Sequence, residues 1–152
     1  MKIILVAAIT MTGGFAYESK TPWNDSDEFS LFQSIIKGKT ILLGRKTYES
    51  IPKKSPGKTY LVVTSKKIPD VRTFTSLEQA LAHARTITSE LYVVGGKSIY
   101  DHTIKHADML YLSFMKKEYK TDTFFPSWKG WQLEKIEEHR TFDFCVFKRP
   151  SL

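Results

Sequence analysis

The sequence predicts an α/β fold in a single domain over residues 1–152, with a mostly parallel central sheet, about four flanking helices and an antiparallel C-terminal edge hairpin. Short apolar runs rich in β-branched residues alternate with helical segments along most of the chain, and this alternation is typical of parallel sheets. The C-terminal part instead holds two extended runs, 131–137 and 142–148, with no helix between them. Consecutive extended runs predict an antiparallel pair at the edge of the sheet.

The first strand is expected at residues 2–9, KIILVAAI. A short apolar stretch also occurs in signal peptides, but the β-branched residues and the following glycine turn favour a buried strand. Residues 13–24 contain several breakers and are expected to be irregular. A helix is expected over 25–37, with Gly38 as its C-cap. The remaining elements are expected in this order: strand 40–43, helix 44–50, strand 59–65, short strand 71–74, helix 77–88, strand and turn 91–96, helix 97–105 and strand 109–114.

Composition narrows the classes of function. The net charge is +7, but the basic residues are scattered and form no basic tail or helix face, so nucleic-acid binding is disfavoured. An anionic ligand or solubility accounts for the charge. No run of 18 apolar residues occurs, so no membrane span is expected. The single cysteine, Cys145, and four histidines without metal-ligand spacing predict neither a disulfide nor a metal site, and we expect a cytoplasmic monomer.

The segment 23–29, WNDSDEF, holds the first candidate for chemistry. Asp25 followed three residues later by Glu28 is a capping-box pattern, and acidic residues suit the positive end of a helix, so capping alone can explain both carboxylates. However, the i, i+4 spacing puts Glu28 on the same helix face as Phe32. In an aromatic cleft the pKa of this carboxyl would rise, and Glu28 could bind and protonate a heteroaromatic substrate.

Two glycine-containing segments are candidates for phosphate binding. In VVGGKSIY at 93–100, a strand runs through two glycines into a helix, so the backbone can approach an anion and helix N–H groups can face it. GRKTYES at 44–50 has the same layout, with basic and hydroxyl side chains at the helix start. Each segment also fits an ordinary turn or a solvated helix start. The full G-x-G-x-x-G fingerprint is absent, so an ordinary Rossmann site is not expected.

Taken in order, these segments resemble dihydrofolate reductase. The resemblance covers nearly the whole chain, and its specificity lies in the order and spacing of motifs that are weak singly. The motifs are VAAI at 6–9, PWN at 22–24, EFSLF at 28–32, GRKTYESIP at 44–52, PGK at 56–58, VVTS at 62–65, VVGGKSIY at 93–100 and DTFFP at 122–126. The resemblance implies the fold of dihydrofolate reductase. It also implies that the protein reduces 7,8-dihydrofolate to 5,6,7,8-tetrahydrofolate with NADPH as the cofactor. It further implies antifolate inhibitors as ligands, and a role in one-carbon metabolism and thymidylate synthesis.

The resemblance also implies site residues. Glu28 looks like the active-site acid that holds the amidine edge of the pterin and promotes protonation of the adjacent ring nitrogen through water. Ser113 would orient that carboxylate, and Trp23 would hold the water. The implied substrate-binding residues are Val6, Ala7, Ala8, Glu28, Phe29, Phe32, Ile51, Lys58, Val94, Tyr100 and Ser113. The implied cofactor-binding residues are Ala8, Ile9, Ala16, Thr21, Gly44, Arg45, Lys46, Thr47, Thr64, Ser65, Lys66, Val94, Gly95, Gly96, Lys97, Ser98, Ile99, Tyr100 and Thr123. Gly95-Gly96 looks like the family's cis glycine pair.

Three positions depart from the family pattern. Lys58 stands where an arginine usually clamps the α-carboxylate of the substrate, and lysine cannot form a bidentate fork. Ala16 and Thr21 replace a glycine and a bulky apolar residue in the loop over the nicotinamide. These changes bear on substrate affinity and loop closure more than on the class of reaction.

Two other functions remain open at this point. One is a reductase of the pyrimidine deaminase/reductase family acting on a ribosylated pyrimidine, although PWN, the following acid and DTFFP favour the folate enzyme. The other is a non-catalytic dinucleotide- or nucleic-acid-binding protein that keeps the fold. Loss of NADPH absorbance in the presence of dihydrofolate separates all three.

Overall fold

The structure, a computed structural model, describes residues 1–51 and 59–150. Its strands are β1 (Lys2–Ile9), β2 (Gly14–Ala16), β3 (Thr40–Gly44), β4 (Thr59–Val63), β5 (Arg72–Phe74), β6 (Glu90–Val93), β7 (Met109–Met115), β8 (Thr123–Phe124), β9 (Gln132–Glu138) and β10 (Phe142–Lys148). Its helices are α1 (Ser26–Ile36), α2 (Arg45–Ser50), α3 (Leu77–Ile87) and α4 (Lys97–Thr103), followed by a short 3-10 turn, η1 (Ile104–His106).

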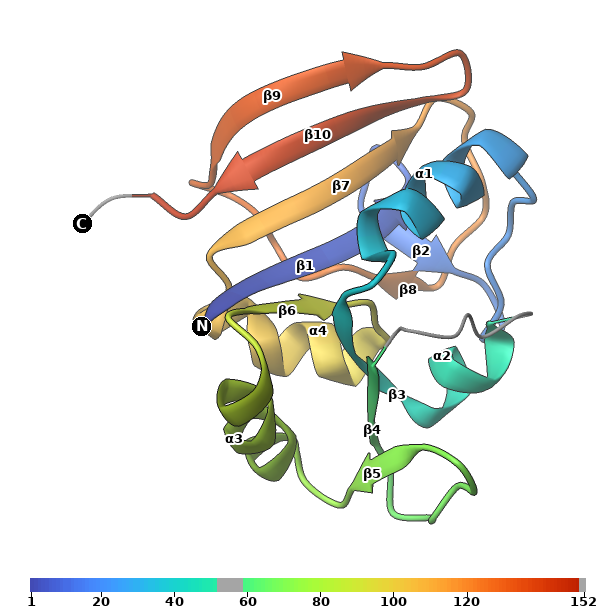
Figure 1. The fold of residues 1–152 in the computed structure, drawn as a ribbon. Coiled ribbons are helices and arrows are strands. Elements are labelled where there is room, and N and C mark those ends of the chain that lie inside the picture. The colour runs from blue at the N-terminus through green and yellow to red at the C-terminus, as the bar shows by residue number, and fades with distance from the viewer. Residues whose placement is uncertain (52–58, 151–152) are drawn as a thin grey trace.

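A central sheet carries these elements (Figure 1). Within the described residues it has eight strands in the order β5-β4-β3-β6-β1-β7-β10-β9. Neighbours are parallel from β5 to β7, and β10 pairs antiparallel with both β7 and β9. The predicted fold class is therefore confirmed, including the C-terminal hairpin at the edge of the sheet.

Strand β1 is buried because helices cover both faces of the sheet. Leu5 packs in a cluster with Ala84 of α3, whereas Ile4 packs in a second cluster with Ile36 of α1. Successive side chains of a strand point to opposite faces, so a strand covered on both sides reads as a continuous apolar run. That run is what residues 2–9 display.

The order of the strands creates a crevice between β1 and β6. Strand β3 follows β1 and α1 in the chain but lies on the far side of β6, while β7 follows β6 and α4 but lies on the far side of β1. The two crossovers therefore leave in opposite directions, and the loops at the carboxyl ends of β1 and β6 diverge. Ligands of parallel α/β sheets bind at such a switch point.

The region expected to be irregular, 13–24, contains a strand. Gly14–Ala16 forms β2, which pairs antiparallel with β8 in a separate two-stranded sheet. Tyr17 and Lys20 then form an antiparallel bridge, closed by backbone hydrogen bonds of 2.8 and 3.0 Å. The partner β8 lies far along the chain, so no local pattern indicates the pairing.

Two elements, β4 and α4, end two residues earlier than the sequence prediction. Strand β4 ends at Val63 rather than 65, because Thr64 Oγ1 accepts a hydrogen bond from the Lys66 N–H at 3.1 Å and turns the chain. Helix α4 ends at Thr103, where the chain tightens into η1. In contrast, Gly38 directly follows the C-cap of α1 with a φ of +70°, as expected for a glycine that ends a helix.

Candidate active site

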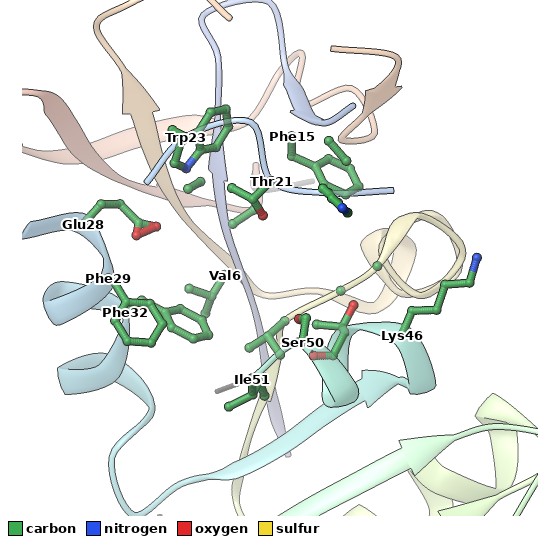
Figure 2. Close-up of a pocket in the computed structure, with 18 of the residues that line it drawn as sticks. Val6, Phe15, Thr21, Trp23, Glu28, Phe29, Phe32, Lys46, Ser50 and Ile51 are labelled. Atoms are coloured by element: carbon green, nitrogen blue, oxygen red, sulfur yellow. Dashed lines mark hydrogen bonds between the residues drawn. The ribbon is translucent and has the colours of Figure 1, made fainter. Parts of the chain in front are cut away.

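A cavity of about 530 Å³ lies at the carboxyl ends of β1, β3 and β6, where the crossovers diverge (Figure 2). Its size is that of a small-molecule site. The lining residues come from β1, the loop 15–25, α1, α2 and the turn after β6. They are Val6, Ala7, Ala8, Phe15, Ala16, Ser19, Lys20, Thr21, Trp23, Asn24, Asp25, Glu28, Phe29, Phe32, Lys46, Thr47, Ser50, Ile51, Val94, Gly95, Gly96 and Tyr100.

Glu28 stands in the first turn of α1, and its carboxylate turns into the cavity (Figure 2). Asp25 caps the helix, since its Oδ1 accepts hydrogen bonds from the N–H groups of Asp27 at 3.1 Å and Glu28 at 3.0 Å. Within the described part of the chain, the Glu28 carboxylate does not return a hydrogen bond to the Asp25 N–H. The capping box is therefore half formed, and capping does not account for Glu28.

The environment of Glu28 favours its protonated form. Burial, followed by the negative charge of Asp25, raises the pKa of the Glu28 carboxyl to about 7. A carboxyl with this pKa can hold or release a proton near neutral pH, which is what general acid–base chemistry requires.

The wall beside Glu28 is aromatic. The rings of Phe29 and Phe32 lie 6.4 Å apart, and Phe29 is 45% exposed although it is apolar. Figure 2 shows Ile51 across the cavity from Phe32. The cavity therefore offers an apolar slot for a flat ring, with the Glu28 carboxyl at its polar edge.

The turn after β6 forms the floor of the cavity. The Gly95-Gly96 peptide bond is cis, as the resemblance implied. Gly95 has a φ of +119°, and a Cβ there would come within 3.3 Å of the Tyr100 ring, so the position requires glycine. Tyr100 is buried, and its hydroxyl donates a hydrogen bond of 2.7 Å to Val6 O. This bond ties α4 to the end of β1.

The end of the cavity opposite Glu28 is cationic. Figure 2 shows Lys46 of α2 on the far side of the slot from Glu28, and Lys20 lines the same cavity. Neither lysine has an ion-pair partner among residues 1–51 and 59–150, whereas Arg45 pairs with Glu49 at 2.8 Å. Unpaired cations in a cavity favour an anionic part of the ligand.

Most of the expected site residues gather in this cavity. Of the implied substrate residues, Val6, Ala7, Ala8, Glu28, Phe29, Phe32, Ile51, Val94 and Tyr100 line it. Of the implied cofactor residues, Ala8, Ala16, Thr21, Lys46, Thr47, Val94, Gly95, Gly96 and Tyr100 line it. Lys58 lies outside the described residues. Trp23 lies in the wall and packs on Tyr119, with ring centroids 5.2 Å apart.

The other expected residues lie outside the cavity wall. Ser113 is buried on β7 directly beside Ala8, and no hydrogen bond joins its hydroxyl to Glu28 in the described structure. Lys97 is tied to Asp101 at 3.1 Å and to Phe124 O at 2.9 Å. The remaining ones are Ile9, Gly44, Arg45, Thr64, Ser65, Lys66, Ser98, Ile99 and Thr123.

Several lining residues were not anticipated: Phe15, Ser19, Lys20, Asn24, Asp25 and Ser50. Ser50 could have been found, because it lies three residues after Thr47 and so on the same face of α2. Phe15 and Lys20 carry no local signal. They reach the wall because β2 pairs with β8 and Tyr17 pairs with Lys20.

Residues 1–51 and 59–150 hold no group of three or more His, Cys, Asp or Glu side chains placed to bind a metal ion. They also hold no helix that is both long and apolar enough to cross a bilayer.

The fold and the cavity together are those of an α/β enzyme that binds a flat ring at a carboxyl and an anionic group beside it. A sequence profile of the dihydrofolate reductase family matches residues 2–149. The chain therefore belongs to the dihydrofolate reductase family, whose members reduce dihydrofolate with NADPH, and it is an enzyme of this type.

Individual relatives agree with this placement. Dihydrofolate reductase type 6 of Proteus mirabilis is 39% identical, covering 83% of this chain and 82% of the relative. The Haemophilus influenzae dihydrofolate reductase is 29% identical, covering 94% and 91%. The solved dihydrofolate reductase from Enterococcus faecalis, complexed with NADP(H) and RAB-propyl, has a TM-score of 0.87 at 23% identity and covers 99% of this chain and 97% of its own. At that identity the last comparison supports the fold.

Proposed function

We propose that Glu28 is the acid that assists protonation when this chain reduces 7,8-dihydrofolate to 5,6,7,8-tetrahydrofolate. The observation that carries the proposal is a half-buried carboxyl, that of Glu28, with a pKa of about 7 at the edge of an aromatic slot. Such a carboxyl can bind the amidine edge of a pterin and share a proton with it. The proton must reach the ring nitrogen beside the carbon that accepts hydride, and the route we propose is a water held by Trp23, with Ser113 supporting the carboxylate.

The cofactor end of the cavity suits a dinucleotide. Lys46 and Thr47 line this end, and Lys46 has no carboxylate partner among the described residues. The backbone of Gly95-Gly96 forms the floor without a side chain between it and a ligand. Bound NADPH supplies the hydride, and the similar Enterococcus faecalis enzyme was solved with NADP(H). Residues 64–66 follow β4 and would meet the adenosine end.

The rest of the proposal follows from the family. Lys58 would hold the glutamyl carboxylate of the substrate, and antifolates would occupy the slot beside Glu28. We further propose that residues 1–152 act as a single-domain, cytoplasmic monomer that supplies tetrahydrofolate for one-carbon metabolism and thymidylate synthesis. Neither nucleic acid nor a metal ion has a part in this scheme.

Replacing Glu28 tests the proposal. The rate of NADPH consumption with dihydrofolate should give a kcat/KM that falls above about pH 7, because the essential carboxyl loses its proton there. Glu28→Gln should lose about 100-fold or more at neutral pH, within the range of general acid catalysis. The loss should be smaller at low pH, where the substrate is already protonated.

Asp27→Asn is the matched control, because it removes the same charge from the same helix turn at an exposed position. It should retain wild-type kcat/KM. A fully active Glu28→Gln variant would reject the proposal.

A further inference from the structure

We propose that Asp25 is a positioning residue: its carboxylate fixes the start of α1, and its negative charge keeps the proton on Glu28. This inference rests on the proposed role of Glu28, and it assigns a function to a carboxylate that sequence patterns explain as a helix cap.

The geometry of the α1 terminus links the two carboxyls. The Asp25 Oδ1 accepts the N–H of Glu28 itself at 3.0 Å, so the capping carboxylate is bound to the backbone of the acid. Both residues line the same cavity. The cap fixes the first turn of α1, and that turn determines where the Glu28 side chain enters the slot.

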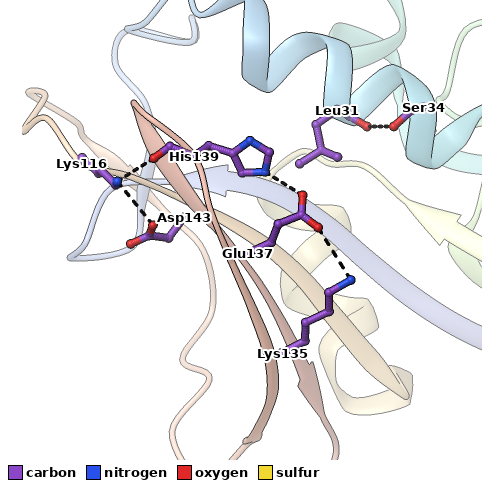
Figure 3. Close-up of polar contacts among 7 residues, drawn as sticks. All are labelled: Leu31, Ser34, Lys116, Lys135, Glu137, His139 and Asp143. Carbon is purple, nitrogen blue, oxygen red and sulfur yellow. Dashed lines mark hydrogen bonds and ion pairs between the residues drawn. The ribbon is translucent and has the colours of Figure 1, made fainter.

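Polar contacts hold the β9–β10 turn to Lys116, which directly follows β7 (Figure 3). Lys116 Nζ donates a 2.6 Å hydrogen bond to His139 O and pairs with Asp143 at 3.6 Å. The Lys116 N–H donates to Thr141 O at 3.0 Å, and the His139 ring stacks on Phe142 at 4.4 Å. Phe142 in turn packs in one apolar cluster with Leu31 of α1 and Trp23.

The helix terminus favours the ionised form of Asp25, because its Oδ1 accepts the N–H groups of Asp27 and Glu28. Burial alone would raise the pKa of the Asp25 carboxyl. The N–H groups of Glu28 and Asp27, together with the nearby Thr141 side chain and the positive charge of Arg140, lower it below its ordinary value. Asp25 is therefore an anion at neutral pH. Its charge adds to burial in raising the pKa of Glu28. The pKa values of these two neighbouring carboxyls are therefore shifted in opposite directions. Asp25 stays charged, and Glu28 is the group that titrates near neutral pH.

Other groups around Glu28 do not supply this effect. The ionisable groups on the surrounding elements are Asp27 on α1, Lys20 before Thr21, Lys46 on α2, Tyr100 on α4, Tyr111 on β7, Tyr119 after β7 and Arg140. Phenols carry no charge near neutral pH, and the cations would favour the ionised form of Glu28. Asp27 is exposed, so solvent screens its charge. Asp25 is therefore the carboxylate whose charge raises the pKa of Glu28.

The decisive experiment separates the charge of Asp25 from its capping bonds. Asparagine and serine cap helices about as well as aspartate, so Asp25→Asn and Asp25→Ser keep the cap and remove the charge. Asp27→Asn removes an equal charge next to it. The readout is the titration midpoint of the Glu28 carboxyl carbon, measured by NMR in each free protein.

In both Asp25 variants the midpoint should fall by about half to one pH unit, since the screened charge is close but partly in solvent. The alkaline limb of kcat/KM should move with it, so that activity above the midpoint drops about three- to tenfold. Asp27→Asn should leave both unchanged. An unchanged Glu28 midpoint in Asp25→Asn and Asp25→Ser, or an equal change in Asp27→Asn, would overturn the inference. The NMR titration does not depend on turnover, whereas the activity of Glu28→Gln decides the role of Glu28 in catalysis, so the two hypotheses fail separately.

Discussion

Glu28→Gln should make the protein more stable at alkaline pH, in the opposite direction to its effect on activity. The Glu28 carboxyl has an ordinary pKa of 4.5 when exposed and a pKa of about 7 in the fold. Between these values the folded state binds more protons than the unfolded state, so stability falls as pH rises through this window. Glutamine carries no ionisable proton, so the variant does not share this loss.

The size of the effect follows from the same two values. The difference between 4.5 and about 7 corresponds to about 3 kcal/mol at full development. This is an upper value, because the carboxyl retains some contact with solvent. For a chain of this length each kcal/mol changes Tm by roughly 2–4 °C, so Glu28→Gln should gain up to about 6–12 °C over wild type on going from acid to alkaline pH.

The assay is thermal or urea unfolding of the ligand-free proteins from about pH 4 to about pH 9. The stability difference between Glu28→Gln and wild type should grow between about pH 4.5 and 7 and then level off. Asp27→Asn is again the matched control, and its difference from wild type should be flat across this window. A difference for Glu28→Gln that does not change with pH would refute the argument, since it would mean that folding does not change the proton affinity of Glu28.

Two further predictions concern ligands. NADPH should be preferred over NADH by about ten- to a thousandfold in kcat/KM. The residues expected near the 2′-phosphate, Arg45, Lys46, Ser65 and Lys66, would offer it charge-assisted hydrogen bonds of roughly 1.5–3 kcal/mol each. Steady-state rates with both cofactors measure the preference, and equal use would count against that placement. Lys58→Arg should tighten dihydrofolate binding by about five- to thirtyfold, because a second hydrogen bond of about 1–2 kcal/mol becomes available to the carboxylate. Dissociation constants with a pterin that lacks the glutamyl tail are the control for this variant, and an equal change for both ligands would reject the clamp.

Local patterns in the sequence were sufficient for most of the fold. The continuous apolar run of β1 indicated a strand covered on both faces, and Asp25 and Gly38 marked the ends of α1. The two extended runs near the C-terminus indicated the β9–β10 hairpin. Each of these features depends on the periodicity of neighbouring residues or on one terminal residue, so it can be read without knowing the partner elements.

The site was only partly accessible in this way. The order of the motifs indicated a family in which Glu28, Phe32 and Gly95-Gly96 would belong to one site. The structure brings these residues to one cavity. The motifs were unable to choose between a capping carboxylate and a titrating acid, because that choice depends on burial. Lys20 was missed since it enters the wall through the pairing of β2 with β8.

The sequence by itself determined the fold class and the family, and it singled out Glu28 as the candidate acid. What only the tertiary structure decided was the state of that acid. Segments distant in the chain, including the loop at Trp23 and the end of β1, enclose Glu28 and raise its pKa, and Arg140 from the β9–β10 turn contributes to the lowered pKa of Asp25. Desolvation and Coulomb interactions depend on distances in space, and local sequence patterns specify only separations along the chain.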